Sequence, residues 1–309
     1  MERDAALLVT GGSGMVGSAL LRELTRLGYS HALSPQRGQL DLADRSAVQA
    51  YFEIHRPAYC FMLAARVGGI QANMDDPLGF LSDNLCIEQN LFSACEKFPP
   101  KKCLFLGSSC VYPRDCPQPM REEYLLSGPL EPTNEGYALA KIAGLKMAQF
   151  LHKRSGILTV CPMPCNLYGT GDHFDLQKAH VLSSLVKRFV DARRSAADSV
   201  TLWGNGSARR EFLHVDDIVR AMLFFMEKVE STDIMNVGAG ADISIRELAQ
   251  LVCQVSGFRG QILWDTSKPN GMPRKCLDVS RVSALGFKPQ ISLQEGIERT
   301  VREYETLMT

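Results

Sequence analysis

The stretch AALLVTGGSGMVG, residues 5–17, decides the fold of this chain. Residues 5–10 form an apolar run typical of a buried strand, and a helical pattern follows over residues 15–27. The glycines between them permit a tight turn, so that a pyrophosphate can bind the free N–H groups at the positive end of the new helix. This order predicts dinucleotide binding, with a merely structural turn as the alternative. The expected contacts are Gly11, Ser13, Gly14, Met15, Val16 and Gly17.

Short apolar runs alternate with helix-length amphipathic stretches through the first half of the chain. This alternation is typical of a doubly wound parallel sheet, and the right-handed crossover rule makes the predicted sheet Rossmann-like. We therefore expect an α/β fold with a smaller C-terminal substrate-binding α/β region. Strands are expected at residues 5–10, 31–34, 59–64, 102–107 and 158–163. Helices are expected at residues 15–27, 45–55, 78–98 and 135–154.

The pattern loosens after about Asn166 into loops, a helix over residues 181–192 and a strand over residues 200–203. We predict a nucleotide-binding Rossmann domain over residues 1–166 and a mainly substrate-binding region over residues 167–309. The segment 212–230 starts as a strand and continues as an apolar-faced helix. It is therefore expected to return to the first domain.

The composition limits the partners. Lys plus Arg and Asp plus Glu both total 34, so the net charge is zero, and nothing favours nucleic acid or an anionic membrane surface. No apolar run approaches the ~20 residues that span a bilayer, so we expect a cytoplasmic protein. The ten cysteines include no CxxC pair, which favours buried small hydrophobic side chains over disulfides and predicts no metal site.

The end of the second expected strand bears on the choice of cofactor. NAD-selective sites place an Asp or Glu there to bind the ribose 2′-hydroxyl, but here no acid occurs before Asp41. Arg37, helped by Ser34, could instead bind the 2′-phosphate of NADP through its guanidinium fork. We predict NADP as the cofactor, with Arg37 as an ordinary solvated loop residue as the alternative.

Two motifs indicate proton-transfer chemistry. Tyr137 and Lys141 lie four residues apart, hence on one face of the expected helix, where the ammonium can favour ionisation of the phenol. The polar cluster GSSCVYP, residues 107–113, follows an expected strand at the sheet edge where open α/β sheets bind ligands. The phenol could thus exchange a proton with a carbonyl or an alcohol.

These motifs resemble the extended short-chain dehydrogenase/reductase family. The resemblance assigns Ser108, Tyr137 and Lys141 as the catalytic triad, with Ser109 less suited than Ser108 to the catalytic position. Longer stretches are similar to the members that epimerise and reduce GDP-4-keto-deoxysugars. These stretches are residues 64–70, 104–113, 130–144, 166–169, 210–217, 243–251 and 267–279.

The resemblance also assigns Cys110 and His180 to epimerisation. A ketone at C4 of the hexose acidifies the hydrogens at C3 and C5, and inversion needs two acid/base groups. Ordinary pKa values of ~8.5 for Cys and ~6.5 for His suit proton transfer near neutrality. From the residues alone, Cys110 would be a buried core thiol and His180 a surface residue at a helix start.

Further ligand contacts are carried over from the resemblance. The additional cofactor contacts implied are Asp41, Leu42, Ala64, Ala65, Lys141 and His180. The implied substrate contacts are Ser108, Ser109, Asn166, Arg188, Trp203, Arg210 and Lys275. Trp203 could equally belong to the core. Two departures occur near these sites: Ser13, where some members carry Arg, and the segment 169–174.

The implied reaction is C3 and C5 epimerisation of GDP-4-keto-6-deoxy-D-mannose followed by NADPH reduction at C4, which yields GDP-L-fucose. GDP-L-colitose synthesis, with inversion at C5 only, is the nearest alternative. A 4-epimerase or 4,6-dehydratase fits less well, since dehydratases of this superfamily carry Thr-Asp-Glu near residues 108–110. A non-catalytic NADP-binding sensor is the alternative from another class. A homodimer through helices 78–98 and 135–154 is expected by family analogy.

Overall fold

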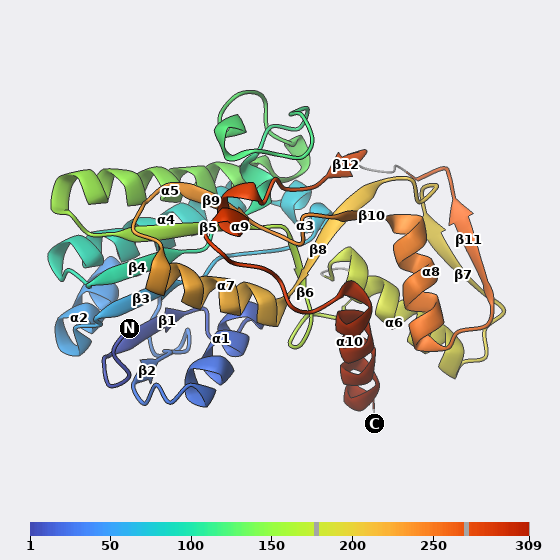
Figure 1. The fold of residues 1–309 in the computed structure, drawn as a ribbon, viewed down its shortest axis with the longest axis horizontal. Coiled ribbons are helices and arrows are strands. Elements are labelled where there is room, and N and C mark those ends of the chain that lie inside the picture. Colours follow the sequence, from blue (N-terminus) through green and yellow to red (C-terminus); the bar gives the residue numbers. More distant parts are fainter. Residues whose placement is uncertain (176–178, 269–271, 309) are drawn as a thin grey trace.

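The computed structural model describes residues 1–175, 179–268 and 272–308. A six-stranded parallel sheet in the order β2-β1-β3-β4-β5-β9 forms its larger part and confirms the predicted Rossmann-like fold (Figure 1). The strands are β1 (Leu7–Thr10), β2 (Ala32–Leu33), β3 (Tyr59–Met62), β4 (Lys102–Phe105), β5 (Thr159–Pro164) and β9 (Ile234–Val237). Every residue of β1, β3, β4 and β5 is buried, as expected for a sheet covered on both faces.

Helices cover both faces of this sheet, with α4 and α5 on one side and α1 and α7 on the other (Figure 1). They are α1 (Met15–Arg26), α2 (Arg45–His55), α4 (Pro77–Lys97), α5 (Glu135–Ser155) and α7 (Val215–Lys228). Local sequence fixes several ends. The Asp44 side chain accepts hydrogen bonds from the N–H groups of Ser46 and Ala47 at the start of α2, and Gly156, with φ 72°, caps the end of α5.

A second region packs against the carboxyl end of the sheet. Its strands are β6 (Asn166–Tyr168), β8 (Arg209–His214), β10 (Asp242–Ser244) and β12 (Arg274–Lys275), with β7 (Ser199–Trp203) and β11 (Gln261–Asp265) as a separate pair. The helices α6 (Val181–Arg194), α8 (Ile245–Ser256) and α10 (Leu293–Leu307) pack with these strands around a second core. Shorter helices are α3 (Ile70–Asp75), η1 (Ser109–Val111), η2 (Glu122–Tyr124), η3 (Pro132–Asn134) and α9 (Ser280–Ala284).

The segment expected to return to the first domain divides between the two regions. Strand β8 belongs to the smaller sheet, whereas α7 packs against α1, β4 and β5 in the larger core. The chain then adds β9 beside β5. Strand β9 is not among the predicted strands, because a four-residue strand carries too little periodicity to stand out from its surroundings.

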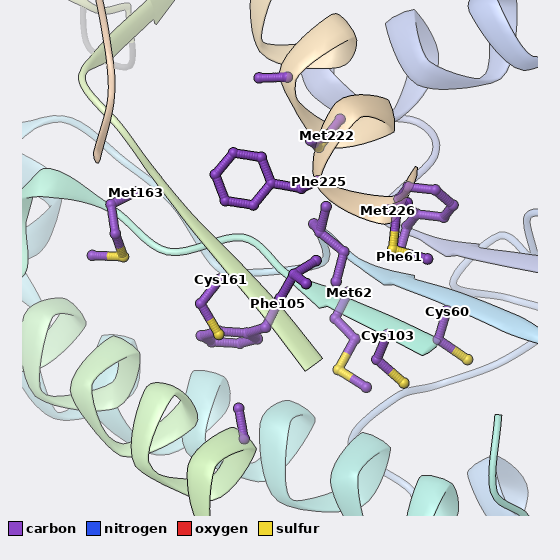
Figure 2. Close-up of a cluster of buried hydrophobic side chains, with 14 of the residues drawn as sticks. Cys60, Phe61, Met62, Cys103, Phe105, Cys161, Met163, Met222, Phe225 and Met226 are labelled. Carbon is purple, nitrogen blue, oxygen red and sulfur yellow. The ribbon is translucent and has the colours of Figure 1, made fainter. Parts of the chain in front are cut away.

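The larger core is rich in sulfur and aromatic side chains, with Phe225 of α7 on one side of the sheet and the ring of Phe105 on the other (Figure 2). Seven of the ten cysteines are buried and all ten are free thiols, which confirms the expectation of buried small side chains. Three of them, Cys60, Cys95 and Cys103, bring their sulfur atoms within 4.8 Å of one another. Among the described residues, no helix is long and apolar enough to cross a membrane.

Candidate active site

The glycine-rich turn packs directly onto the end of strand β3. Gly11 has φ 73°, and a Cβ there would lie 2.9 Å from the backbone N of Ala64. The Thr10 hydroxyl accepts hydrogen bonds from the N–H groups of Leu63 (3.1 Å) and Ala64 (3.2 Å), which fixes the two segments together. Gly14 is the N-cap of α1 and offers no side-chain cap. The first N–H groups of α1 therefore face a site that a side chain does not occupy.

The surroundings of this turn fit a dinucleotide. A Cβ on Gly12 would lie 1.9 Å from the Ser34 hydroxyl oxygen, so a larger residue would close the space between the turn and the end of β2. That hydroxyl is buried without a hydrogen-bond partner among the described residues. Arg37 and Ser13 are exposed, and Asp41 accepts a hydrogen bond from the N–H of Ala43. An orphan hydroxyl and an exposed guanidinium are groups that a phosphorylated ribose can bind.

The polar cluster after β4 forms a short helical turn at the carboxyl end of the sheet. Ser108 caps η1, and its hydroxyl accepts the Cys110 N–H at 3.3 Å. Cys110 is only 7% exposed. The Tyr112 hydroxyl donates to Oδ1 of buried Asn236 at 2.6 Å, which ties η1 to β9. This anchor was missed at sequence level, because β9 lies more than a hundred residues further along the chain.

Helix α5 packs against η1 and carries Tyr137 and Lys141. Lys141 is 3% exposed, and its Nζ lies 5.9 Å from the centre of the Tyr137 ring and 4.5 Å from the centre of the Phe105 ring. The four-residue spacing thus places the ammonium beside the phenol. Cys110 lies on η1, which Ser108 caps and which packs against the helix that carries both groups.

Electrostatic interactions link these side chains. Burial raises the pKa of Tyr137 well above its ordinary value, and Cys110 and Glu88 raise it further. Burial also raises the pKa of the Cys110 thiol, which Lys275, Ser108 and Lys141 oppose. Both groups therefore hold their protons near neutral pH until a ligand changes their surroundings.

A buried carboxylate, Glu88 on α4, completes this cluster. Its Oε1 lies 3.4 Å from Lys141 Nζ, and both side chains are 3% exposed. Burial raises the pKa of Glu88 to about 7, although Lys141 lowers it. Glu88 could not be identified from the sequence, since a single Glu within an amphipathic helix carries no signal that it faces inward.

Arg210 and Lys275 lie side by side on the second sheet, where they are register partners of β8 and β12. Burial lowers the pKa of both groups, and Cys110 opposes this change at Lys275. The Arg210 guanidinium donates to the carbonyl oxygens of Arg209 (2.8 Å) and Met272 (2.7 Å). Asn166 on β6 donates to the carbonyl oxygen of Glu211 at 2.8 Å.

The remaining predicted residues lie on α6 and β7 of the second region or cap α6. His180 is the exposed N-cap of α6, and no hydrogen bond or ion pair between described residues joins it to Cys110. Arg188 is half-buried two turns later and donates to the Ser184 hydroxyl at 3.4 Å. Trp203 is 67% exposed, with Lys268 Nζ 5.6 Å from its ring centre, so its alternative assignment to the core is wrong.

The segment 169–174, which departs from the family pattern, is held by its own contacts. The Gly171 N–H donates to Glu303 of α10 at 2.8 Å, and the Ser183 hydroxyl of α6 donates to Asp172. Phe174 packs 4.6 Å from the Tyr304 ring, centre to centre. The altered residues thus anchor this loop to α6 and α10. In the family-like stretch 267–279, residues 269–271 lie outside the described part of the chain.

Comparison with known proteins gives consistent matches over almost the whole chain. The model of the NAD dependent epimerase/dehydratase family matches residues 7–238. GDP-L-fucose synthase of Escherichia coli (strain K12) is 43% identical over 303 residues, which cover 95% of this chain and 94% of that protein. GDP-L-fucose synthase 1 of Arabidopsis thaliana is 42% identical over 303 residues, covering 98% and 94%. Among solved structures, a GDP-L-fucose synthetase from Naegleria fowleri bound to NADP has a TM-score of 0.91 and 26% identity, covering 100% of this chain and 97% of that one.

Proposed function

Because the chain belongs to the NAD-dependent epimerase/dehydratase family and resembles its GDP-L-fucose synthases, we propose that it converts GDP-4-keto-6-deoxy-D-mannose to GDP-L-fucose. The observation that carries this proposal is the cluster of Ser108, Cys110, Tyr137 and Lys141 at the carboxyl end of β4. A plain reductase needs no thiol beside its Tyr and Lys. Carbon epimerisation does need a further acid/base group, and Cys110 lies next to them.

The cofactor of the proposed reaction is NADPH, which, when bound, supplies a hydride to C4. The turn of residues 11–17 would hold its pyrophosphate on the N–H groups of α1, and the Ser34 hydroxyl and Arg37 would bind the 2′-phosphate. Asp41, Leu42, Ala64 and Ala65 would line the adenosine side of this site. A solved relative that binds NADP supports the assignment.

Epimerisation would use Cys110 and His180 on opposite faces of the sugar. One group removes the proton from C3 or C5, and the other returns a proton to the opposite face, so each carbon inverts with no net change in protons. Because its pKa is raised, the Cys110 thiol keeps its proton near neutral pH and can act as the proton donor. Ser108 and Tyr137 would stabilise the enolate oxygen at C4 by hydrogen bonding.

Reduction would use Tyr137 as the proton donor to the C4 oxygen. Burial keeps the phenol protonated, and Lys141 favours the phenolate that remains after the proton has left. Lys141 and His180 would also contact the nicotinamide end of the cofactor. The chemistry therefore separates into proton exchange at carbon and proton transfer to oxygen.

Binding of the GDP-sugar would fall mainly to the second region. Arg188, Arg210 and Lys275 would supply positive charge for the diphosphate. Burial lowers the pKa of Arg210 and Lys275, and an anionic diphosphate bound beside them would oppose that change. The exposed face of Trp203 is available for stacking. Asn166 and Ser109 complete the proposed contacts.

Product NMR tests this function. Purified protein is incubated with NADPH and either GDP-4-keto-6-deoxy-D-mannose or its 3-deoxy counterpart. We expect stoichiometric NADPH oxidation with the first substrate and GDP-L-fucose as the product. Faster turnover of the 3-deoxy sugar, with inversion at C5 only, would identify a GDP-L-colitose synthase instead. NADPH binding with no turnover of either sugar would indicate a non-catalytic sensor.

The same family relationship leads us to propose a homodimer through α4 and α5. Large apolar side chains remain exposed on α5, since Leu139 is 41% and Phe150 is 61% exposed. Burying such side chains in a two-helix face would be favourable. Light scattering during size-exclusion chromatography should give twice the chain mass, and Phe150→Glu should shift the protein towards monomer. A monomer at micromolar concentration would exclude this assembly.

A further inference from the structure

The carboxylate of Glu88 is buried in an unusual way for a charged group. The residue is 2% exposed, and neither of its carboxylate oxygens accepts a hydrogen bond from any described residue. Native proteins satisfy most buried polar atoms, and those left over call for an explanation in function or strain. Its ion-pair partner among the described residues is Lys141, whose Nζ lies 3.4 Å from Oε1, longer than a usual charge-assisted hydrogen bond.

The packing between α4 and α5 leaves room for this carboxylate and little else. A Cβ at Gly144, one turn after Lys141, would lie 2.7 Å from Glu88 Oε2 and 2.3 Å from Phe105 Cζ. The absence of a side chain at Gly144 thus lets the carboxylate reach the space beside the Phe105 ring. Lys141 Nζ lies over that ring, 4.5 Å from its centre. The ammonium is therefore held between a carboxylate and an aromatic face.

We propose that Glu88 is a positioning residue for Lys141: from the α4 side it holds the ammonium beside Tyr137. The inference rests on the proposed reductase role of Tyr137 and Lys141. Glu88 itself is shielded from solvent, so it acts through Lys141 and not on the substrate. An ionised carboxylate attracts the ammonium strongly in this low-dielectric setting, whereas a protonated one holds it weakly.

The positioning should therefore depend on pH. Burial raises the pKa of Glu88 to about 7, against the opposing effect of Lys141. The titratable groups around the pair are Tyr137 on α5, whose pKa Glu88 raises, and Cys110 on η1, whose pKa Lys141 lowers. Phe105 from β4 adds no charge. Glu88 thus holds Lys141 mainly above about pH 7 and releases it below.

Glu88→Gln keeps the shape of the side chain and removes its charge. Single-turnover NADPH oxidation by wild type and variant is compared at about pH 6 and about pH 8, with both ligands saturating. A small misplacement of a catalytic group can cost up to ~10²-fold in rate, so we expect the variant to be about tenfold slower at the higher pH and nearly equal at the lower. If Glu88 had a purely structural role, the variant would be slowed by the same factor at both pH values.

Two variants serve as controls. Glu88→Asp retains the charge and should retain the pH dependence of wild type. Glu211 on β8 is another buried glutamate whose pKa is raised to about 7, but it accepts the N–H groups of Gly240 and Leu277 and makes no ion pair with Lys141. Glu211→Gln should therefore leave the ratio of rates at the two pH values unchanged.

NADPH affinity, measured by quenching of protein fluorescence in the same samples, separates this inference from the proposed function. Lys141 is proposed to contact the cofactor. The ratio of the NADPH affinity of wild type to that of Glu88→Gln should therefore rise about threefold or more between about pH 6 and about pH 8. If wild type binds NADPH with this pattern but does not turn over the sugar, the proposed substrate is wrong and the role of Glu88 stands. Two results together would overturn the role of Glu88. NADPH affinity would change equally with pH in wild type and Glu88→Gln, and the ratio of their single-turnover rates would be the same at both pH values.

Discussion

The two regions of the molecule reach their proposed functions in different ways. In the six-stranded region, groups that act together lie close in sequence, as in the turn of residues 11–17 or the pair Tyr137 and Lys141. In the second region, Arg188, Trp203 and Arg210 come from three separate elements, α6, β7 and β8. Most of the chemistry is thus assigned to local motifs, with His180 at the start of α6 as the exception, and substrate selection to tertiary packing. A fold can keep the first while it varies the second.

The largest effect should come from the six-stranded region. Tyr137→Phe removes the proton donor but preserves the ring and the helix, so C4 reduction should fall by about 10²–10⁴-fold. NADPH affinity should change little, because the turn of residues 11–17 is untouched. Stopped-flow oxidation of NADPH, with a separate binding titration, measures both. Near-normal turnover would place the reductase centre elsewhere.

A smaller effect is expected from the second region. Arg210→Ala removes a partly buried cation beside Lys275, so the KM for the GDP-sugar should rise by about 10–100-fold, as expected when one or two charge-assisted contacts are lost. The Kd for NADPH should stay within a few-fold of wild type. Steady-state kinetics with varied sugar concentration provide the measurement. A loss of NADPH binding instead would mean that the two regions do not divide the ligands as proposed.

A weaker effect is expected on the choice between NADPH and NADH. Arg37→Ala removes one exposed guanidinium, and we expect about a tenfold loss of affinity for NADPH with little change for NADH. Parallel titrations with the two cofactors test this. Equal or better catalytic efficiency of wild type with NADH would remove Arg37 from the site.

Stability offers a comparison of one buried glutamate from each region, apart from activity. The pKa values of Glu88 and Glu211 in the folded protein are raised to about 7 from 4.5. The native state therefore binds these protons more tightly than the unfolded state, so the contribution of each group to the free energy of unfolding falls as pH rises from about 4.5 to about 7. In urea denaturation series over this pH range, the free energy of unfolding of Glu88→Gln or Glu211→Gln should fall by on the order of 1–3 kcal/mol less than that of wild type. Unchanged slopes would show that neither carboxyl titrates in this range.

The same contrast between regions explains what the sequence could predict. The helix expected over residues 45–55 is found at Arg45–His55, and the glycine-rich turn lies between strand and helix as expected, because capping, periodicity and turn chemistry are local. Strand β9 and the contacts of Asn236 depend on pairings across the chain, which a single sequence does not reveal.

Among the candidate site residues, those on η1 and α5 could be placed relative to one another from spacing and strand order. The inward orientation of Glu88 could not be predicted, since it results from the packing of α4 on α5 and from the absence of a side chain at Gly144. The exposure of Trp203 was equally hidden, because an aromatic residue at a strand end suits either a core or a binding surface.

The central claim is that proton exchange at carbon and reduction at C4 use different side chains of one site. Deuterium incorporation in heavy water tests this claim most directly. Wild type, Cys110→Ala, His180→Ala and Tyr137→Phe are incubated with NADPH and GDP-4-keto-6-deoxy-D-mannose, and label at C3 and C5 is read by NMR. Cys110→Ala and His180→Ala should lose most of the label, by about 10²–10⁴-fold in exchange rate, while still binding NADPH. Tyr137→Phe should keep exchanging without reduction. GDP-L-fucose formed at the normal rate and fully labelled by both Cys110→Ala and His180→Ala would contradict the account.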